Sequence, residues 1–160
     1  MIRALLDTDV VLDLLLDRTP FADAAEALWE AHRQGQFAAF ISPITPVNVF
    51  YITQKVKGLR AAHKAVADVL TTVLVCPADH MILASAMTLA FDDFEDAVQH
   101  SVAAASGLDA IITRNLADYA RASIPVYSPT DFLNLLSSTL YISKSIADGK
   151  SETDQFVTRD

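Results

Sequence analysis

Short apolar stretches alternate along the chain with longer segments in which apolar residues recur every three or four positions. The short stretches have the length of strands and occupy residues 2–6, 38–41, 73–75, 110–112 and 125–127. The longer segments predict helices that begin at Pro20, Thr45, Ala61, Asp79 and Phe94 and end before Gly35, near Gly58, and at Thr71, Ala90 and Ala105. Strands that alternate with helices of this size form repeated βα units. The pattern therefore predicts a three-layer α/β/α sandwich around a central, mainly parallel sheet.

The length and composition indicate one soluble domain. A chain of 160 residues with 52% hydrophobic residues is large enough to bury a core, and it is too apolar to be disordered. No apolar run approaches the roughly 20 residues of a membrane-spanning helix. The single cysteine, Cys76, excludes an internal disulfide and a cysteine-built metal site. We expect residues 1–140 to form a cytoplasmic domain, and residues 141–160 to form a mobile polar tail.

Positive charge is concentrated in one segment, although the chain carries a formal net charge of −8. Residues 31–67 contain no acid, and acidic segments lie on both sides of them. The basic side chains near Gly58 are Lys55, Lys57, Arg60 and Lys64. This segment is either an ordinary solvated helix surface or a set of phosphate contacts for nucleic acid, which a uniformly acidic protein would bind poorly.

Acidic and polar side chains follow two of the predicted strands. Asp7 and Asp9 come directly after the first strand, and residues 113–118 follow the fourth. Asp96 lies in an acidic group that opens the helix at Phe94. Each acid alone could be a helix cap or a favourable charge at a helix N-terminus. In a parallel α/β sheet, however, ligands bind beyond the carboxyl ends of the strands, and converging acids repel one another unless a cation lies among them.

Four segments together resemble the motifs of PIN domains. Residues 5–13 (LLDTDVVLD) look like the opening motif, which is usually written LLDTN followed by an apolar helix. Residues 93–97 (DFEDA) resemble the third motif, and residues 111–119 (IITRNLADY) resemble the fourth. Residues 41–48 (ISPITPVN) lie where the second motif belongs. The ordered set, which covers residues 1–132, is more specific than any one of its motifs.

This resemblance implies a metal-dependent ribonuclease fold and site. Small single-domain bacterial members are typically VapC-type toxins paired with antitoxins. The metal ligands implied are Asp7, Asp96, Asp118, Asn115 and Asn48. The resemblance also implies catalytic roles for Asp7, Asp96, Asp118 and Thr113, whose hydroxyl would orient a ligand or the attacking water. Asn48 stands where the family usually has Glu, and its amide oxygen could bind a metal but brings no negative charge.

The implied cofactor is Mg²⁺ or Mn²⁺, because hard cations suit carboxylate and water ligands. The expected reaction is hydrolysis of an RNA phosphodiester bond, in which the ion lowers the pKa of a bound water and stabilises charge on phosphorus. The basic residues between Lys55 and Lys64 would hold the RNA backbone. The partners implied by the resemblance are RNA, an antitoxin and a second copy in a homodimer, and no membrane is expected.

Other classes of protein share parts of this pattern. A haloacid-dehalogenase-like phosphatase also places Asp-x-Asp after its first strand, but its motif normally continues with Gly-Thr, where this chain has Val10 and Val11. Such a phosphatase and a receiver domain both need a later Lys at a strand end, and none is found there. A third alternative is a catalytically weak or silent PIN module that binds RNA or a protein. The amides of Asn48 and Asn115 are consistent with it.

Overall fold

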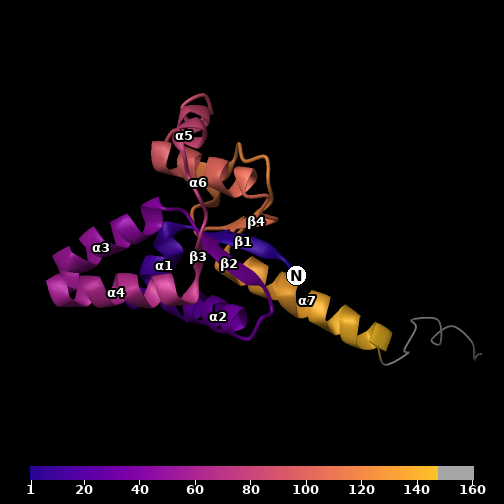
Figure 1. Cartoon of the computed structure of the whole chain (residues 1–160). Coiled ribbons are helices and arrows are strands. Elements are labelled where there is room, and N and C mark those ends of the chain that lie inside the picture. Colours follow the sequence, from indigo (N-terminus) through magenta and orange to yellow (C-terminus); the bar gives the residue numbers. More distant parts are fainter. Residues whose placement is uncertain (148–160) are drawn as a thin grey trace, which may run out of the picture.

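A central parallel sheet organises residues 1–147, the part of the chain that the computed structural model describes (Figure 1). Its strands are β1 (Arg3–Leu6), β2 (Ala38–Ile41), β3 (Leu74–Val75), β4 (Ala110–Ile112) and β5 (Val126–Tyr127). They lie in the order β3-β2-β1-β4-β5, and every neighbouring pair is parallel. The predicted strands are confirmed, and β1, β3 and β5 each begin one residue later than the apolar run.

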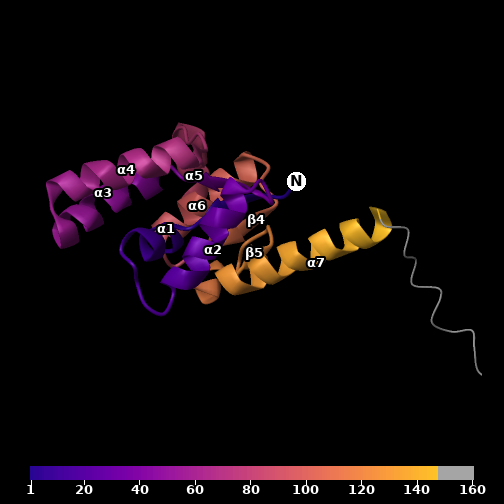
Figure 2. The same cartoon turned by 90° about the horizontal axis from the view of Figure 1, so that it is seen from below.

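Helices cover both faces of the sheet. They are α1 (Thr8–Leu15), α2 (Ala22–Arg33), α3 (Ile44–Lys57), α4 (Leu59–Thr72), α5 (His80–Ala86), α6 (Phe94–Ala105) and α7 (Pro129–Ala147), with a 3₁₀ turn η1 (Leu116–Tyr119). In Figures 1 and 2, α5 and α6 lie on one face, whereas α2 and α7 lie on the other. Helices α3 and α4 form a hairpin that extends away from the sheet. The predicted three-layer α/β/α sandwich is confirmed.

The alternation of side chains along β1 divides the core between the two faces. Ala4 and Leu6 pack in a cluster that includes Val11, on the side of α1 and α2. Leu5 points the opposite way and packs in a second cluster with Val98 of α6. Successive residues of a strand face opposite sides, and β1 is covered on both. The unbroken apolar run at residues 2–6 is therefore what a central strand requires.

Helix α1 was expected only from the resemblance to PIN domains, and two other helices differ from the pattern of the sequence. Helix α5 ends at Ala86 rather than at residue 90, and Ala86 is its one buried residue, so packing does not prolong it. Helix α7 was not predicted, and it extends to Ala147, into the segment expected to be a tail. Residues 148–160 lie outside the described residues, and the mobility of the tail stays a prediction. Among the described helices, none is long and apolar enough to cross a membrane.

The order of the strands creates a crevice at the carboxyl end of β1. The chain passes from β1 to β2 and β3 on one side, and then crosses to β4 on the other side of β1. The chain therefore leaves β1 towards one edge of the sheet and leaves β4 towards the other edge. Open α/β sheets bind ligands between two such strands. Asp7 follows β1 directly, and Thr113 follows β4 directly, so both residues lie at this crevice.

Candidate active site

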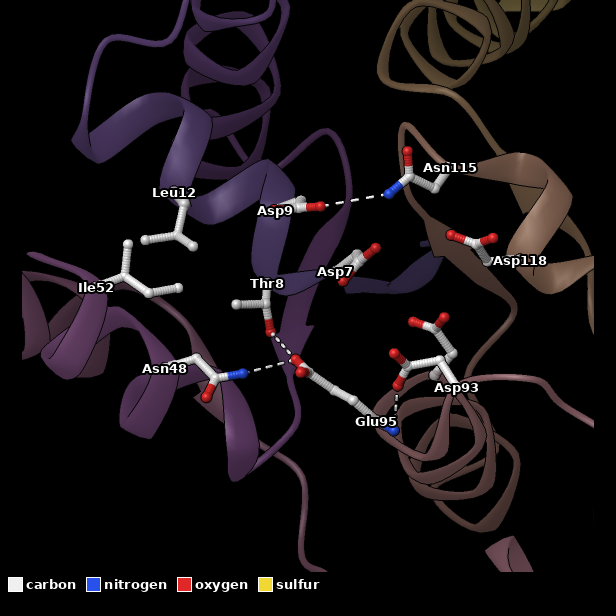
Figure 3. A pocket seen from close by; sticks show the side chains of 11 residues that line it. Asp7, Thr8, Asp9, Leu12, Asn48, Ile52, Asp93, Glu95, Asn115 and Asp118 are labelled. Atoms are coloured by element: carbon white, nitrogen blue, oxygen red, sulfur yellow. Dashed lines mark hydrogen bonds between the residues drawn. The ribbon is translucent and has the colours of Figure 1, made fainter.

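An acidic cleft of about 190 Å³ opens at the carboxyl ends of β1 and β4 (Figure 3). It is lined by Asp7, Thr8, Asp9, Leu12, Asn48, Ile52, Asp93, Glu95, Asp96, Asn115 and Asp118. These side chains come from the start of α1, from α3, from the first turn of α6 and from the segment after β4. The five predicted metal ligands are therefore brought together at one cleft, although their metal binding stays a prediction.

Asp7 is held by two buried side chains. It is the N-cap residue of α1, but its carboxylate makes no capping hydrogen bond. The Thr113 hydroxyl instead donates to Oδ2 at 2.6 Å, and Gln99 Nε2 donates to Oδ1 at 2.9 Å. Burial raises the pKa of Asp7, and these two hydrogen bonds offset part of that rise. Thr113 thus orients Asp7, and Gln99 does so too, although Gln99 was not predicted.

Asp96 lies in the first turn of α6 and lines the same cleft. Partial burial, together with the negative charges of Asp7 and Asp93, raises the pKa of Asp96 to about 7. At neutral pH this carboxylate therefore holds a proton far more often than an ordinary Asp does. A carboxyl group that is poised in this way within a cleft is typical of functional sites.

Glu95 reaches across the cleft to α3, and the sequence did not indicate it. Its Oε1 atom accepts a hydrogen bond from Asn48 Nδ2 at 2.8 Å and another from the Thr8 hydroxyl at 3.1 Å (Figure 3). Because the Thr8 hydroxyl proton points to Glu95, the Thr45 hydroxyl must be the donor in its 3.1 Å contact with Thr8. Burial raises the pKa of Glu95, and the hydrogen bonds from Thr8 and Asn48 oppose that rise.

Asp9 is neutralised by arginines. Its Oδ1 atom lies 3.3 Å from Arg18 Nη1 and 3.4 Å from Arg114 Nη2. The same two arginines also pair with the buried Asp13, and Arg114 Nη1 lies 3.1 Å from Asp13 Oδ1. The Arg114 guanidinium also lies 4.5 Å from the centre of the Phe21 ring. This cluster ties α1 to the segment after β4, and it compensates one of the negative charges at the edge of the cleft.

The segment after β4 places its two predicted ligands differently. The backbone N–H of Asn115 donates to the Thr113 hydroxyl at 3.0 Å, and its amide Nδ2 is 3.4 Å from Asp9 Oδ2. Asp118 projects into the cleft from η1 (Figure 3). Asp118 therefore offers a carboxylate to the cleft, whereas the Asn115 amide is directed towards Asp9.

The predicted RNA-binding residues lie at the outer end of the α3–α4 hairpin. Lys55, Lys57, Arg60 and Lys64 are exposed. Lys57 donates to the carbonyl of Leu15 at 3.1 Å, and Lys64 pairs with Asp68 one turn further along α4. Lys55 lies about 10 Å along α3 from Asn48, at 1.5 Å per residue. The basic side chains are thus outside the cleft, and their contact with RNA stays a prediction.

The chemistry of the donors fits a hard divalent cation. The cleft offers carboxylate and amide oxygens, which suit Mg²⁺ or Mn²⁺. Within residues 1–147, no group of three or more Asp, Glu, His or Cys side chains is arranged so that it could hold a metal ion by itself. Mg²⁺ does not need such a cage, because it commonly keeps several waters and binds through one or two carboxylates together with substrate phosphates.

Known proteins share this fold. The VapBC-1 structure from nontypeable Haemophilus influenzae has a TM-score of 0.63 at 16% identity, with 81% of this chain and 99% of that chain covered. VapC20 from Mycobacterium tuberculosis, described as a toxin that cleaves the sarcin–ricin loop, has a TM-score of 0.62 at 19% identity. The match covers 76% of this chain and 95% of that chain. A toxin–antitoxin complex from Klebsiella pneumoniae has a TM-score of 0.58 at 28% identity, with 79% of this chain and 97% of that chain covered. No curated protein sequence matches the chain.

The sequence itself matches a family model. The model describes a PIN domain and covers residues 3–117, from β1 into η1. This span includes four of the predicted metal ligands and ends one residue before Asp118. The match extends over more than half of the chain and agrees with the fold of the solved structures. The chain therefore belongs to the PIN domain family.

Proposed function

We propose that this chain is a metal-dependent endoribonuclease, the toxin of a toxin–antitoxin pair that acts in the cytoplasm. The observation that carries this proposal is the meeting of Asp7, Asp96 and Asp118 at one cleft of a PIN domain, at the strand-end crevice where α/β sheets bind ligands. Solved relatives of the fold include a toxin described as cleaving the sarcin–ricin loop and a toxin–antitoxin complex. They support an RNA substrate and an antitoxin partner.

Some residues of the cleft would bind the cation, and others orient the binding residues. Asp7 and Asp96 would hold the cation, with the Asp118 carboxylate nearby in η1. Thr113 and Gln99 keep the Asp7 carboxylate in one orientation. When bound, Mg²⁺ or Mn²⁺ supplies an activated water and stabilises negative charge on the phosphorus. Pairing of Asp9 with arginines leaves the remaining acids as the uncompensated negative charge that attracts a cation.

The test is cleavage of RNA by the purified chain with and without metal. Endonucleolytic products should form in Mg²⁺ or Mn²⁺, disappear in excess chelator, and return when the cation is restored. A parallel preparation of Asp96→Asn controls for a contaminating nuclease. RNA that is bound but left intact under all metal conditions would favour the second candidate, a silent PIN module, for which the uncharged Asn48 is the specific indication.

The basic end of the hairpin should contribute phosphate contacts. Replacing Lys55, Lys57 and Arg60 by Gln should weaken RNA binding and reduce the slope of log Kd against log salt by about one unit per lost contact. Lys64 is already paired with Asp68, and its replacement should have the smallest effect. Binding measured at several salt concentrations checks this, with Arg33→Gln on α2 as control. A slope that changes no more than in the control would mean an ordinary solvated surface.

A further inference from the structure

The carboxylate of Glu95 has one oxygen engaged and one free. Both of its hydrogen bonds, from Asn48 and from Thr8, end on Oε1. Within the described residues, Oε2 accepts no hydrogen bond, and Glu95 lines the cleft together with Asp7 and Asp96. A carboxylate held by one oxygen keeps its other oxygen in a defined direction, which is the condition for binding a cation without a large loss of side-chain freedom.

Asn48 faces Glu95 with its nitrogen. A carboxylate can only accept, so the amide group of Asn48 that contacts Oε1 at 2.8 Å must be the NH₂ donor. Figure 3 shows this nitrogen directed to Glu95 and the amide oxygen turned away from it. A Glu at position 48 would instead place two carboxylates in contact. The uncharged amide on α3 and the extra carboxylate on α6 are thus complementary.

We propose that Glu95 supplies from α6 the carboxylate that Asn48 cannot supply from α3, and that its Oε2 atom is a ligand of the divalent cation. Asn48 and Thr8 are positioning residues that hold Glu95 through Oε1. This inference rests on the proposed function, because it adds a ligand to the same cleft. The cleft then presents as many carboxylates to the cation as it would with a Glu at position 48, but one of them comes from α6 rather than from α3.

A purely structural role for Glu95 predicts different surroundings for its side chain from those observed. An acid in the first turn of a helix is favoured by the partial positive charge at the helix N-terminus, and it can serve that role fully solvated. Glu95 instead spans the cleft and is partly buried against Asn48 and Thr8. A structural bridge needs Oε1 alone, whereas a metal ligand needs the negative charge as well.

The experiment measures Mn²⁺ affinity of the full chain by electron paramagnetic resonance of the free ion. Glu95→Gln keeps an oxygen for Asn48 and Thr8 and removes only the charge. It should weaken Mn²⁺ binding at least about tenfold, while thermal melting in chelator shows that the fold is intact. Asp92→Asn, which removes a nearby exposed charge outside the cleft, should stay within about twofold of wild type.

A double-variant cycle tests the role of Asn48. Asn48→Ala should weaken Mn²⁺ binding in the wild-type background and have no further effect in Glu95→Gln, because it acts through Glu95. Losses that add in the double variant would overturn this positioning role and make Asn48 a ligand itself.

Asp96→Asn distinguishes a failure of the Glu95 assignment from a failure of the proposed function. If Asp96→Asn loses Mn²⁺ binding but Glu95→Gln keeps wild-type affinity, the Glu95 assignment is wrong and the proposed function stands. If both variants keep wild-type affinity, the cleft is not the metal site, and the proposed function fails with the inference. Loss in both variants, with the Asp92→Asn control unchanged, supports the assignment of Glu95.

Discussion

Replacing Asp96 by Asn should lower RNA cleavage at saturating Mg²⁺ by at least about 100-fold. Loss of a residue that merely orients a metal ligand typically costs about 10–100-fold in affinity or activity, and Asp96 is proposed as a ligand itself. The substitution keeps the shape of the side chain and removes a charge from a cleft that Asp7 and Glu95 also line. Single-turnover cleavage of a labelled RNA measures the effect, and Asp92→Asn is the matched control. Equal rates in wild type and Asp96→Asn would remove Asp96 from the mechanism.

Asp96→Asn should also abolish the pH dependence of Mn²⁺ affinity near pH 7. Because the pKa of metal-free Asp96 is raised to about 7, a cation must displace its proton at lower pH. Mn²⁺ affinity of the wild type should therefore fall about tenfold per pH unit below pH 7 and level off above it. In Asp96→Asn any remaining binding should lose this slope near pH 7. A wild-type affinity that stays constant from pH 5.5 to 8 would contradict the assignment.

Regular, well-buried elements could be predicted from the sequence. The bounds of β2, β4 and α6 agree with the predicted ones because each presents an uninterrupted apolar face to the core. Helix α7 was missed, although its start carries a recognisable signal. Ser128 and Asp131 form a capping pair around Pro129, and Phe132 and Leu136 are buried one turn apart. Leu133 and Leu135 pack against the same core, so the helical spacing of apolar residues was also present in the sequence.

Part of the candidate site could also be predicted from the sequence. Asp7 and Asp96 follow from motifs and from the rule that ligands bind at strand ends. Gln99 carried a usable signal, because it is a polar residue one turn after Asp96 on a helix that is buried along its length. Glu95 carried none, since its role depends on contact with Asn48, and only the packing of α6 against the start of α3 shows this proximity.

Asp7 links the proposed metal site to the stability of the fold. Its pKa in the folded chain is raised above the ordinary value of 3.8, mainly by burial. The folded state therefore holds this proton more tightly than the unfolded state does. The stability of the metal-free protein should consequently fall as the pH rises above about 4 and this carboxylate ionises in the unfolded chain. At neutral pH the empty site is thus a source of instability.

Asp7→Asn should relieve that instability by about 1 kcal/mol in chelator at neutral pH, which is roughly 2–4 °C in Tm for a chain of this size. The surroundings can accept the amide. Thr113 can still donate to its oxygen, and Gln99 has a buried Oε1 atom without a hydrogen-bond partner. A flip of the Gln99 amide would let this oxygen accept from the new NH₂ group. The Gln99 NH₂ group then takes the place of the oxygen that has no partner in the wild type, so the number of buried unpartnered groups does not rise.

Adding Mg²⁺ should reverse the order of the melting temperatures of wild type and Asp7→Asn. Mg²⁺ at ten times its Kd stabilises a protein that binds it only when folded by about 1.4 kcal/mol, and Asp7→Asn would not gain this. Wild type should therefore melt below Asp7→Asn in chelator and at or above it in Mg²⁺. Melting curves of both proteins under both conditions measure this. If Asp7 served only to begin α1, Asp7→Asn would be neutral or destabilising and its Tm difference from wild type would not respond to Mg²⁺. The absence of a capping hydrogen bond from its side chain already speaks against that role.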